Sequence, residues 1–378
     1  MELQEYRAVL VETISETYPK YLQEKVVKKL EANNIISTSN VLLSEAEISL
    51  DVSDQPFFDQ IRNAVEQNPD DTIRVIEELE YEYSYKYAVL FNHNSDNIEA
   101  KLMELVEGNL VNNLASEDFT FDYCSDNSES PRVIPTYKMI NEEIDCLKFS
   151  KKVIGFLPVS GDNQRVVKYP IVVLLYKTEK VLEIRFDKIK GFLKNGDEFF
   201  YIKQIQWVSA WLQSKLDLEL VAMNLVPIIE YTIPKESNDE TSEVVVTAQA
   251  MNLASGSKAV LDTGVNDQFV LPLLGELKNL IRDNEELFNT NDETKEIKSK
   301  LTTFIFETEE SSHLPWISLT WKNETKSKAV KVKFSFNYLG QEYSLLQYYG
   351  NNAEMERMNN VTKYLIENQR EYLNQESE

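Results

Sequence analysis

The stretch YPIVVLLYKTEKVLEIRF, residues 169–186, decides the fold of this chain. Ile171 to Tyr176 form a short, continuous apolar run that follows a proline, which is typical of a strand buried on both faces. Four polar residues then predict a turn. After the turn, Leu182, Ile184 and Phe186 alternate with charged residues, as they do in a half-buried strand. We therefore expect an antiparallel hairpin.

A helix is predicted directly after this hairpin. Its apolar residues fall at helical spacing, and two tryptophans occupy a neighbouring stripe. Large aromatic side chains usually pack in cores, so we interpret both tryptophans as a cover for the sheet, with stacking on a base or ligand as the alternative. The residues are Tyr201, Ile205, Val208 and Leu212 on one stripe and Trp207 and Trp211 on the other.

Three segments of different character are expected around this centre. Residues 1–85 carry several amphipathic helical patterns and predict a small acidic helical N-terminal domain. Residues 86–135 predict a strand, a helix and a polar linker rich in Ser, Asp and Asn. Residues 136–378 predict a mixed or antiparallel sheet domain covered by helices. The expected fold class is α+β.

The C-terminal third predicts further strands and helices. Alternation of Val330, Val332, Phe334 and Phe336 with polar residues is typical of a half-buried strand. The other expected elements are strands at Val244–Val246, Lys300–Phe306 and Leu314–Trp321 and helices at Leu271–Phe288 and Met355–Leu373.

Composition excludes several classes of protein. Ten glycines among 378 residues are few for a fold that needs repeated glycine-rich phosphate loops. No stretch reaches the roughly 18 apolar residues that a membrane span needs, and the acidic N-terminus does not resemble a signal peptide. Two cysteines, Cys124 and Cys146, fit a reduced protein without a disulfide framework. We expect a cytoplasmic protein.

Charge is distributed unevenly along the chain, whose net charge is −24. Residues 1–131 carry 9 basic and 27 acidic side chains, whereas residues 132–203 carry 14 basic and 9 acidic ones. Basic residues gather around two predicted hairpins and suggest phosphate contacts. The alternatives are that these lysines protect strand edges or neutralise the acidic helices. The candidate nucleic-acid-binding residues are Lys177, Lys180, Arg185, Lys188 and Lys190 in the first hairpin and Lys322, Lys326, Lys328, Lys331 and Lys333 in the second.

Motifs for catalysis are weak. The chain has two histidines, His93 and His313, and it lacks CxxC, GxSxG, P-loop and HExxH patterns, so we predict no metal site and no cofactor. A metal-dependent nuclease with a Glu-x-Lys triplet beside an Asp stays an alternative. The triplets begin at Glu276, Glu293, Glu296 and Glu324, and none lies in a predicted strand behind a suitable Asp.

The order of elements after residue 170 offers a resemblance to a known family. PIVVLLY, VLEIRFDKI, EVVVTAQA, PLLGELKNLI, PWISLTW and KVKFSFNY are its landmarks. This order resembles that of RexA-type phage-exclusion proteins and of the KwaB subunit of Kiwa defence systems, over about residues 170–378. The resemblance implies a DNA-associated sensor in anti-phage defence, without established catalysis and without binding residues that can be transferred.

These observations predict a cytosolic, non-catalytic binding or sensor protein. We expect it to contact DNA or RNA through the basic hairpins and to meet a protein partner, or further copies of itself, through its helical N-terminal region. Besides the nuclease, a second alternative is an acidic protein–protein adaptor or inhibitor that binds no nucleic acid.

Overall fold

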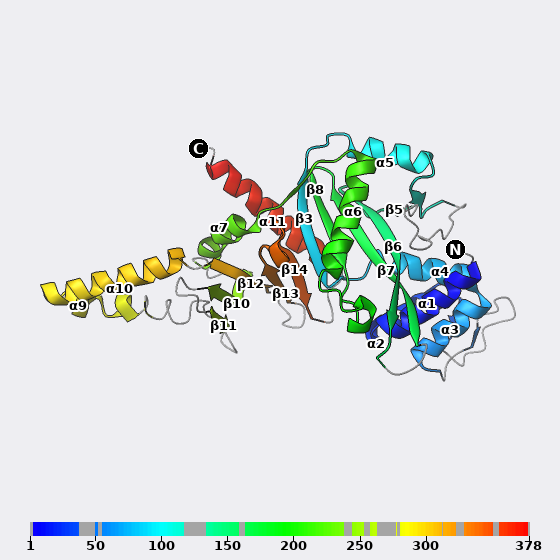
Figure 1. Cartoon of the computed structure of the whole chain (residues 1–378), viewed down its shortest axis with the longest axis horizontal. Coiled ribbons are helices and arrows are strands. Elements are labelled where there is room, and N and C mark those ends of the chain that lie inside the picture. Colours follow the sequence, from blue (N-terminus) through cyan, green and yellow to red (C-terminus); the bar gives the residue numbers. More distant parts are fainter. Residues whose placement is uncertain are drawn as a thin grey trace. The chain divides into compact units, whose positions relative to one another are not determined.

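The fold is α+β and is described from a computed structural model (Figure 1). The structure describes residues 3–37, 50–51, 55–116, 134–158, 163–237, 244–252, 258–262, 277, 280–311, 313–322, 329–350 and 355–376. The chain divides into two compact units, which are described separately. The first holds residues 1–85 and 92–221, and the second holds residues 86–91 and 222–378.

The first unit combines the N-terminal helices with the predicted central hairpin. Its sheet has the order β8-β7-β6-β5-β4, in which β4 and β5 are parallel and the other neighbours are antiparallel. The strands are β4 Asn112–Asn113, β5 Thr136–Met139, β6 Ile144–Phe156, β7 Gln164–Tyr176 and β8 Val181–Phe186, with a separate pair β1 Ile36–Ser37 and β2 Leu50–Asp51. The helices are α1 Leu3–Thr17, α2 Lys20–Ala32, α3 Phe57–Gln67, α4 Pro69–Leu79, α5 Ile98–Glu107, α6 Phe200–Leu216 and the short 3-10 helix η1 Gly191–Lys194.

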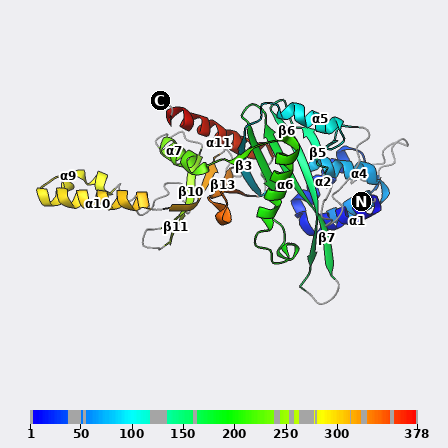
Figure 2. The same cartoon turned by 45° about the horizontal axis from the view of Figure 1, so that its top comes forward.

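Helices cover both faces of this sheet (Figures 1 and 2). Consecutive residues of a strand point to opposite faces of the sheet. Lys148 and Phe149 of β6 therefore contact helices on opposite faces. Phe149 meets Trp207 and Trp211 of α6 edge to face, with ring centroids 5.8 and 5.2 Å apart. Lys148 points the other way, toward Glu77 of α4. The interpretation of the two tryptophans as a sheet cover is confirmed.

The predicted hairpin is confirmed, but one of its faces was misassigned. Val181 pairs with Tyr176 and Phe186 with Ile171 across antiparallel β7 and β8. Every residue of β8 is buried, including Glu183 and Arg185, which were expected on an exposed face. The charged residues could be buried because they pair with each other, at 2.6 Å between Arg185 Nη2 and Glu183 Oε2.

The second unit is built on the sheet order β11-β10-β12-β13-β14-β3. Its strands are β3 Tyr87–His93, whose residues 87–91 belong to this unit, β10 Val244–Asn252, β11 Lys258–Asp262, β12 His313–Trp321, β13 Val330–Ser335 and β14 Leu345–Tyr349. The helices are α7 Leu225–Ser237, α9 Glu285–Phe288, α10 Asp292–Ser311, α11 Met355–Glu376 and the 3-10 helix η3 Tyr338–Gly340. In the short strand β9 Leu220–Ala222, the first two residues belong to the first unit and Ala222 belongs to the second.

One face of the second sheet is packed against α11. Val332 and Phe334 of β13 are fully buried, as are Met358 and Leu365 of the helix. Trp321, at the end of β12, meets Tyr364 of α11 edge to face at 5.7 Å. Alternation along β13 therefore places its even-numbered apolar residues in the core, as predicted.

One predicted strand is wrong. Residues 300–306 lie inside the long helix α10 rather than in a strand. Leu301 and Ile305 are four residues apart and pack together in a small cluster with Ile281, which helical spacing alone permits. This packing overrides the strand preference of the Thr and Phe residues. Of the helix expected at Leu271–Phe288, residues 280–283 and α9 are helical, and 271–276, 278 and 279 lie outside the described residues.

Candidate nucleic-acid interface

The first basic hairpin, in the first unit, is largely neutralised by acidic side chains. Lys177 Nζ lies 3.1 Å from Glu99 of α5 and 3.3 Å from Asp145 of β6. Lys180, at the turn, pairs with Asp96. Lys190 Nζ lies 2.9 Å from Glu16 of α1. Pairing with acidic side chains thus accounts for these three lysines, and Lys190 alone neutralises an acidic residue of the N-terminal helices.

Arg185 is not available for a phosphate. Its side chain is 0% exposed and bound to Glu183, so its choice as a binding residue needs correction. The physical reason is that both faces of β8 are covered, whereas the sequence pattern indicated one exposed face. Lys188 is exposed, and among the described residues it takes part in no ion pair. One of the five candidates in this hairpin therefore retains an exposed, uncompensated charge.

The second basic hairpin lies in the second unit and has a different environment. Lys326 and Lys328 fall outside the described residues, and Lys322 is exposed at the end of β12. Lys331 and Lys333 stand on β13 with their side chains partly exposed. The structure therefore places these last two on the strand in which the alternation predicted them.

Strand register shows which residues share that face. Directly paired residues of adjacent strands point to the same side of a sheet. Lys333 is paired with Ser318 of β12 and Gln347 of β14, and Lys331 with Thr320 and Tyr349. Ser335 is paired with Trp316, which extends the face by one more row. We call this surface the β13 face and define it by Trp316, Ser318, Thr320, Lys331, Lys333, Ser335, Gln347 and Tyr349.

Two aromatic rings belong to the β13 face. Trp316 is partly exposed, and the Lys333 ammonium lies over its ring, 4.1 Å from the centroid. Tyr349 is 40% exposed at the end of β14. An ammonium over an indole gains electrostatic attraction and keeps the lysine near the ring. The β13 face thus combines positive charge with aromatic surface, the two components that nucleic-acid contacts use.

Sequence reasoning selected the lysines of this face but missed its aromatic residues. The signal was present, because in PWISLTW the tryptophan at 316 is in phase with Ser318 and Thr320 and out of phase with buried Ile317 and Leu319. Pairing of that strand with β13 was required to place Trp316 beside Lys333.

A buried charge network occupies the first unit and is closed to ligands. Glu77, Glu80, Lys148 and Lys168 are at most 3% exposed. Lys168 Nζ lies 2.5 Å from Glu77 Oε1 and 2.7 Å from Glu80 Oε2, and Lys148 Nζ lies 2.8 Å from Glu80 Oε2. The hydroxyl of Tyr6 on α1 donates to Glu77. We name these four charged residues the buried charge network.

Electrostatics favours the charged forms of Glu77 and Lys148 in this network. Burial alone would raise the pKa of Glu77, but Lys148 and Lys168 together lower that pKa well below its usual value. Burial alone would lower the pKa of Lys148, but Glu77 and Glu80 raise it. The two ammonium groups and two carboxylates compensate one another, as buried charges must.

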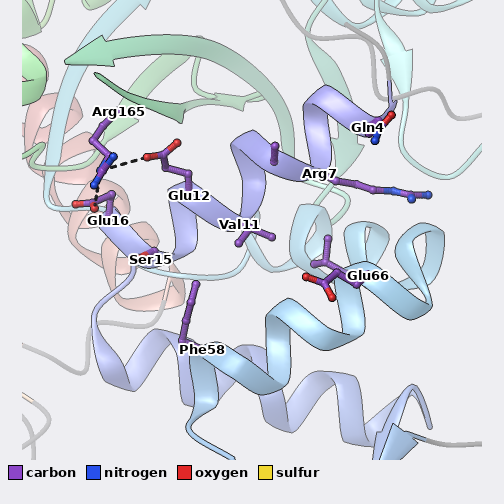
Figure 3. A pocket seen from close by; sticks show the side chains of 11 residues that line it. Gln4, Arg7, Val11, Glu12, Ser15, Glu16, Phe58, Glu66 and Arg165 are labelled. Carbon is purple, nitrogen blue, oxygen red and sulfur yellow. Dashed lines mark ion pairs between the residues drawn. The ribbon is translucent and has the colours of Figure 1, made fainter. Parts of the chain in front are cut away.

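An open pocket of about 610 Å³ lies between α1 and α3 (Figure 3). Val11 and Phe58 supply apolar surface, and Figure 3 shows Glu12 and Glu16 reaching toward Arg165. Arg165 Nε lies 3.3 Å from Glu12 and 3.5 Å from Glu16. The remaining lining residues are Gln4, Arg7, Ala8, Ser15, Val65 and Glu66. The pocket offers apolar surface with a mixed, mainly acidic border.

In the described part of the chain, no side chains are arranged as the nuclease alternative requires. Glu293 and Glu296 lie in α10, where Lys298 pairs with Glu285 at 2.8 Å and Lys295 with Asp292 at 3.6 Å. The triplets that begin at Glu276 and Glu324 fall outside the described residues. Among the residues that can be described, no group of three His, Cys, Asp or Glu side chains is placed to hold a metal ion.

Comparisons with known proteins place the chain in no family. No protein-family model matches it, and no curated protein matches it. Within the ranges that the structure describes, none of the helices has the length and apolar character that crossing a bilayer requires.

Proposed function

We propose that this chain is a non-catalytic binding protein that contacts nucleic acid through the β13 face. The observation that carries the proposal is the placement of Lys333 over the ring of Trp316, with Lys331 on the same side of β13. Lysines attract the phosphates, and aromatic rings give bases a surface on which to stack. The first basic hairpin contributes at most Lys188, because its other basic residues are paired or buried.

The resemblance to RexA-type and KwaB-type proteins extends this proposal to a biological role. It favours a sensor of nucleic acid in bacterial anti-phage defence. A cytoplasmic location belongs to the same proposal, because Cys146 is a free, buried thiol that a reducing compartment preserves.

Charge reversal on the β13 face tests the proposal. The double variant Lys331→Glu, Lys333→Glu should bind a labelled 12-nucleotide DNA or RNA much more weakly than the unaltered chain, measured by fluorescence anisotropy between 20 and ~300 mM salt. Each lysine that contacts a phosphate adds about one to the slope of log affinity against log salt. The matched control is Lys188→Glu, an exposed lysine in the first unit. Equal loss in the control, or unchanged affinity in the double variant, would contradict the proposed interface.

A second function, docking of a basic protein partner, is favoured by the pocket between α1 and α3. Its apolar Val11 and Phe58 beside the exposed Glu66 suit an amphipathic helix with lysines or arginines along its border, while Glu12 and Glu16 are already paired with Arg165. A lysine-rich amphipathic peptide serves as the probe in a titration. Glu66→Lys should weaken its binding, whereas Glu107→Lys, at the end of α5, should not. Equal effects of both substitutions would show that the peptide is attracted by the overall negative charge and does not bind in this pocket.

A further inference from the structure

We infer that the β13 face selects single-stranded over duplex nucleic acid, because it stacks unpaired bases on Trp316 and Tyr349. This inference rests on the proposed function and specifies its ligand. Both rings stand on paired strands of one sheet, so their positions are fixed before any ligand binds. In addition, the Lys333 ammonium lies over one face of the Trp316 ring and leaves the other face for a base.

The distance between the two rings follows from strand geometry. Trp316 is paired with Ser335 and Tyr349 with Lys331, so the rings are four residues apart along β13 and two strands apart across it. At roughly 3.3 Å per residue and about 4.8 Å per strand, the separation of their Cα atoms is about 16 Å. A stacked strand rising about 3.4 Å per nucleotide spans that distance with about five nucleotides, and an extended strand needs fewer.

The surface between the rings suits one strand of nucleic acid. Lys331 and Lys333 lie between the two aromatic residues on the central strand of the three, where they can contact phosphates. Their neighbours Ser318, which is 3% exposed, Thr320 and Ser335 have short side chains, so a strand can approach the sheet closely. The partly exposed Ser335 hydroxyl can add a hydrogen bond that does not depend on base identity.

A duplex cannot use the same features. Its bases are stacked on one another, and their flat surfaces are closed to an external ring. A sheet face also does not enter a groove in the way that a helix or a two-stranded ribbon does. A duplex would therefore gain only the two lysine contacts, whereas a single strand gains the lysines and both rings.

The test compares a 12-nucleotide oligothymidine with a 12-base-pair duplex in fluorescence anisotropy at fixed salt. We expect the single strand to bind at least tenfold more tightly. Trp316→Ala and Tyr349→Ala should each weaken single-strand binding by roughly 5- to 150-fold, the range measured for one base stacked on an aromatic ring, and leave duplex binding nearly unchanged. Affinity for oligothymidines of two to eight nucleotides should stop rising at about five.

Folding controls keep the test decisive. Trp316→Phe retains an aromatic ring and should retain most of the affinity, and circular dichroism with thermal unfolding checks each variant. Quenching of tryptophan fluorescence by oligothymidine should disappear in Trp316→Phe although binding persists. The matched tryptophan control is Trp321→Phe, on the opposite, packed face of the sheet.

The outcomes separate the inference from the proposed function. Equal affinity for single strand and duplex, or unchanged single-strand affinity in a folded Trp316→Ala variant, overturns the inference and leaves the proposed function standing. Absence of binding to every nucleic acid, at all salt concentrations between about 20 and ~300 mM, overturns both. Single-strand preference that both aromatic substitutions remove establishes the stacking site.

Discussion

Replacement of Lys168 by Met tests how the buried charge network stabilises the first unit. Lys168 Nζ contacts Glu77 Oε1 at 2.5 Å, Glu80 Oε2 at 2.7 Å and the Tyr6 hydroxyl at 3.4 Å. Methionine preserves most of the side-chain volume and removes the ammonium group. Two carboxylates then share the single ammonium of Lys148, and one negative charge stays buried without compensation.

The magnitude follows from opposing terms. At an effective dielectric constant of about 20, two carboxylates near 2.6 Å attract the ammonium by roughly 12 kcal/mol in total. Removing the ammonium also removes its own desolvation cost, which is several kcal/mol. The measured loss on breaking such buried pairs is about 3–5 kcal/mol, and we expect a loss in that range. Because whole domains are stable by only about 5–15 kcal/mol, such a loss would remove a large share of the stability of the first unit.

Urea denaturation in a Trp316→Phe, Trp321→Phe background gives the measurement. The remaining tryptophans, Trp207 and Trp211, lie in the first unit and report its unfolding alone. Lys188→Met, which removes an exposed lysine, is the matched control and should change the free energy of unfolding by less than about 0.5 kcal/mol.

A double-mutant cycle completes this test. Removing one charge of each sign, by Lys168→Met with Glu77→Gln, should cost clearly less than the sum of the two single substitutions, because the pair no longer leaves an unmatched charge. A loss below about 1 kcal/mol for Lys168→Met, or strict additivity in the cycle, would refute the view that the network depends on charge balance.

Three further predictions concern the first unit. Since the pKa of Glu77 is lowered on folding, its contribution to stability is fully present above about pH 5 and is lost as the pH falls toward its folded-state pKa. Between pH 6 and pH 3 the urea midpoint should therefore fall by more in the unaltered chain than in Glu77→Gln. Equal falls would contradict this prediction. Burial raises the pKa of the Cys146 thiol to about 12, so in a Cys124→Ser background a thiol reagent should react only at the rate of unfolding; fast reaction in native buffer would show that the thiol is accessible. In Gly155→Ala the new Cβ would lie 2.7 Å from the backbone of Phe192 and Leu193, which should cost about 1–3 kcal/mol in a thermal or urea melt; unchanged stability would show that η1 moves without cost.

Local patterns predicted those elements whose partners are near in sequence. The β7–β8 hairpin depends on a tight turn and on residues within 20 positions, and it is antiparallel as expected. Alternation in β13 and helical spacing in α6 were equally readable. In β13 and α6 the pattern of apolar side chains alone determines which face is buried, whereas β8 is buried on both faces despite its alternation.

The buried charge network could not be predicted, because its partners are distant in sequence. Lys148 meets Glu77 across 71 residues, and Lys168 meets it across 91. In the sequence these lysines look like solvated residues of exposed strand faces. Only the packing of α1 and α4 over the sheet changes them into core residues, and no local signal marks that packing. The strand wrongly expected at residues 300–306 failed for the same reason, since Ile281 is a tertiary partner.

The contrast between the two basic hairpins shows why charge counts alone did not define the site. Both hairpins are rich in lysine, yet Lys177, Lys180 and Lys190 are paired with Glu99, Asp96 and Glu16, the last from the strongly acidic N-terminal helices. Most of the basic excess of residues 132–203 is therefore a complement to the acidic excess of residues 1–131.

This pairing has a consequence for how a chain with net charge −24 can bind a polyanion. Two phosphate contacts by Lys331 and Lys333 give a slope of only about −1.4 in log affinity against log salt for a single strand, which is a weak electrostatic term. At about 0.01 M salt the screening length is about 30 Å, so repulsion by the acidic residues reaches the ligand, whereas at about 0.1 M it is limited to about 10 Å. Stacking on Trp316 and Tyr349 does not depend on salt in this way. An acidic protein that uses only these two lysines therefore needs the aromatic rings to supply most of its affinity, and its binding should weaken below about 0.05 M salt instead of continuing to strengthen.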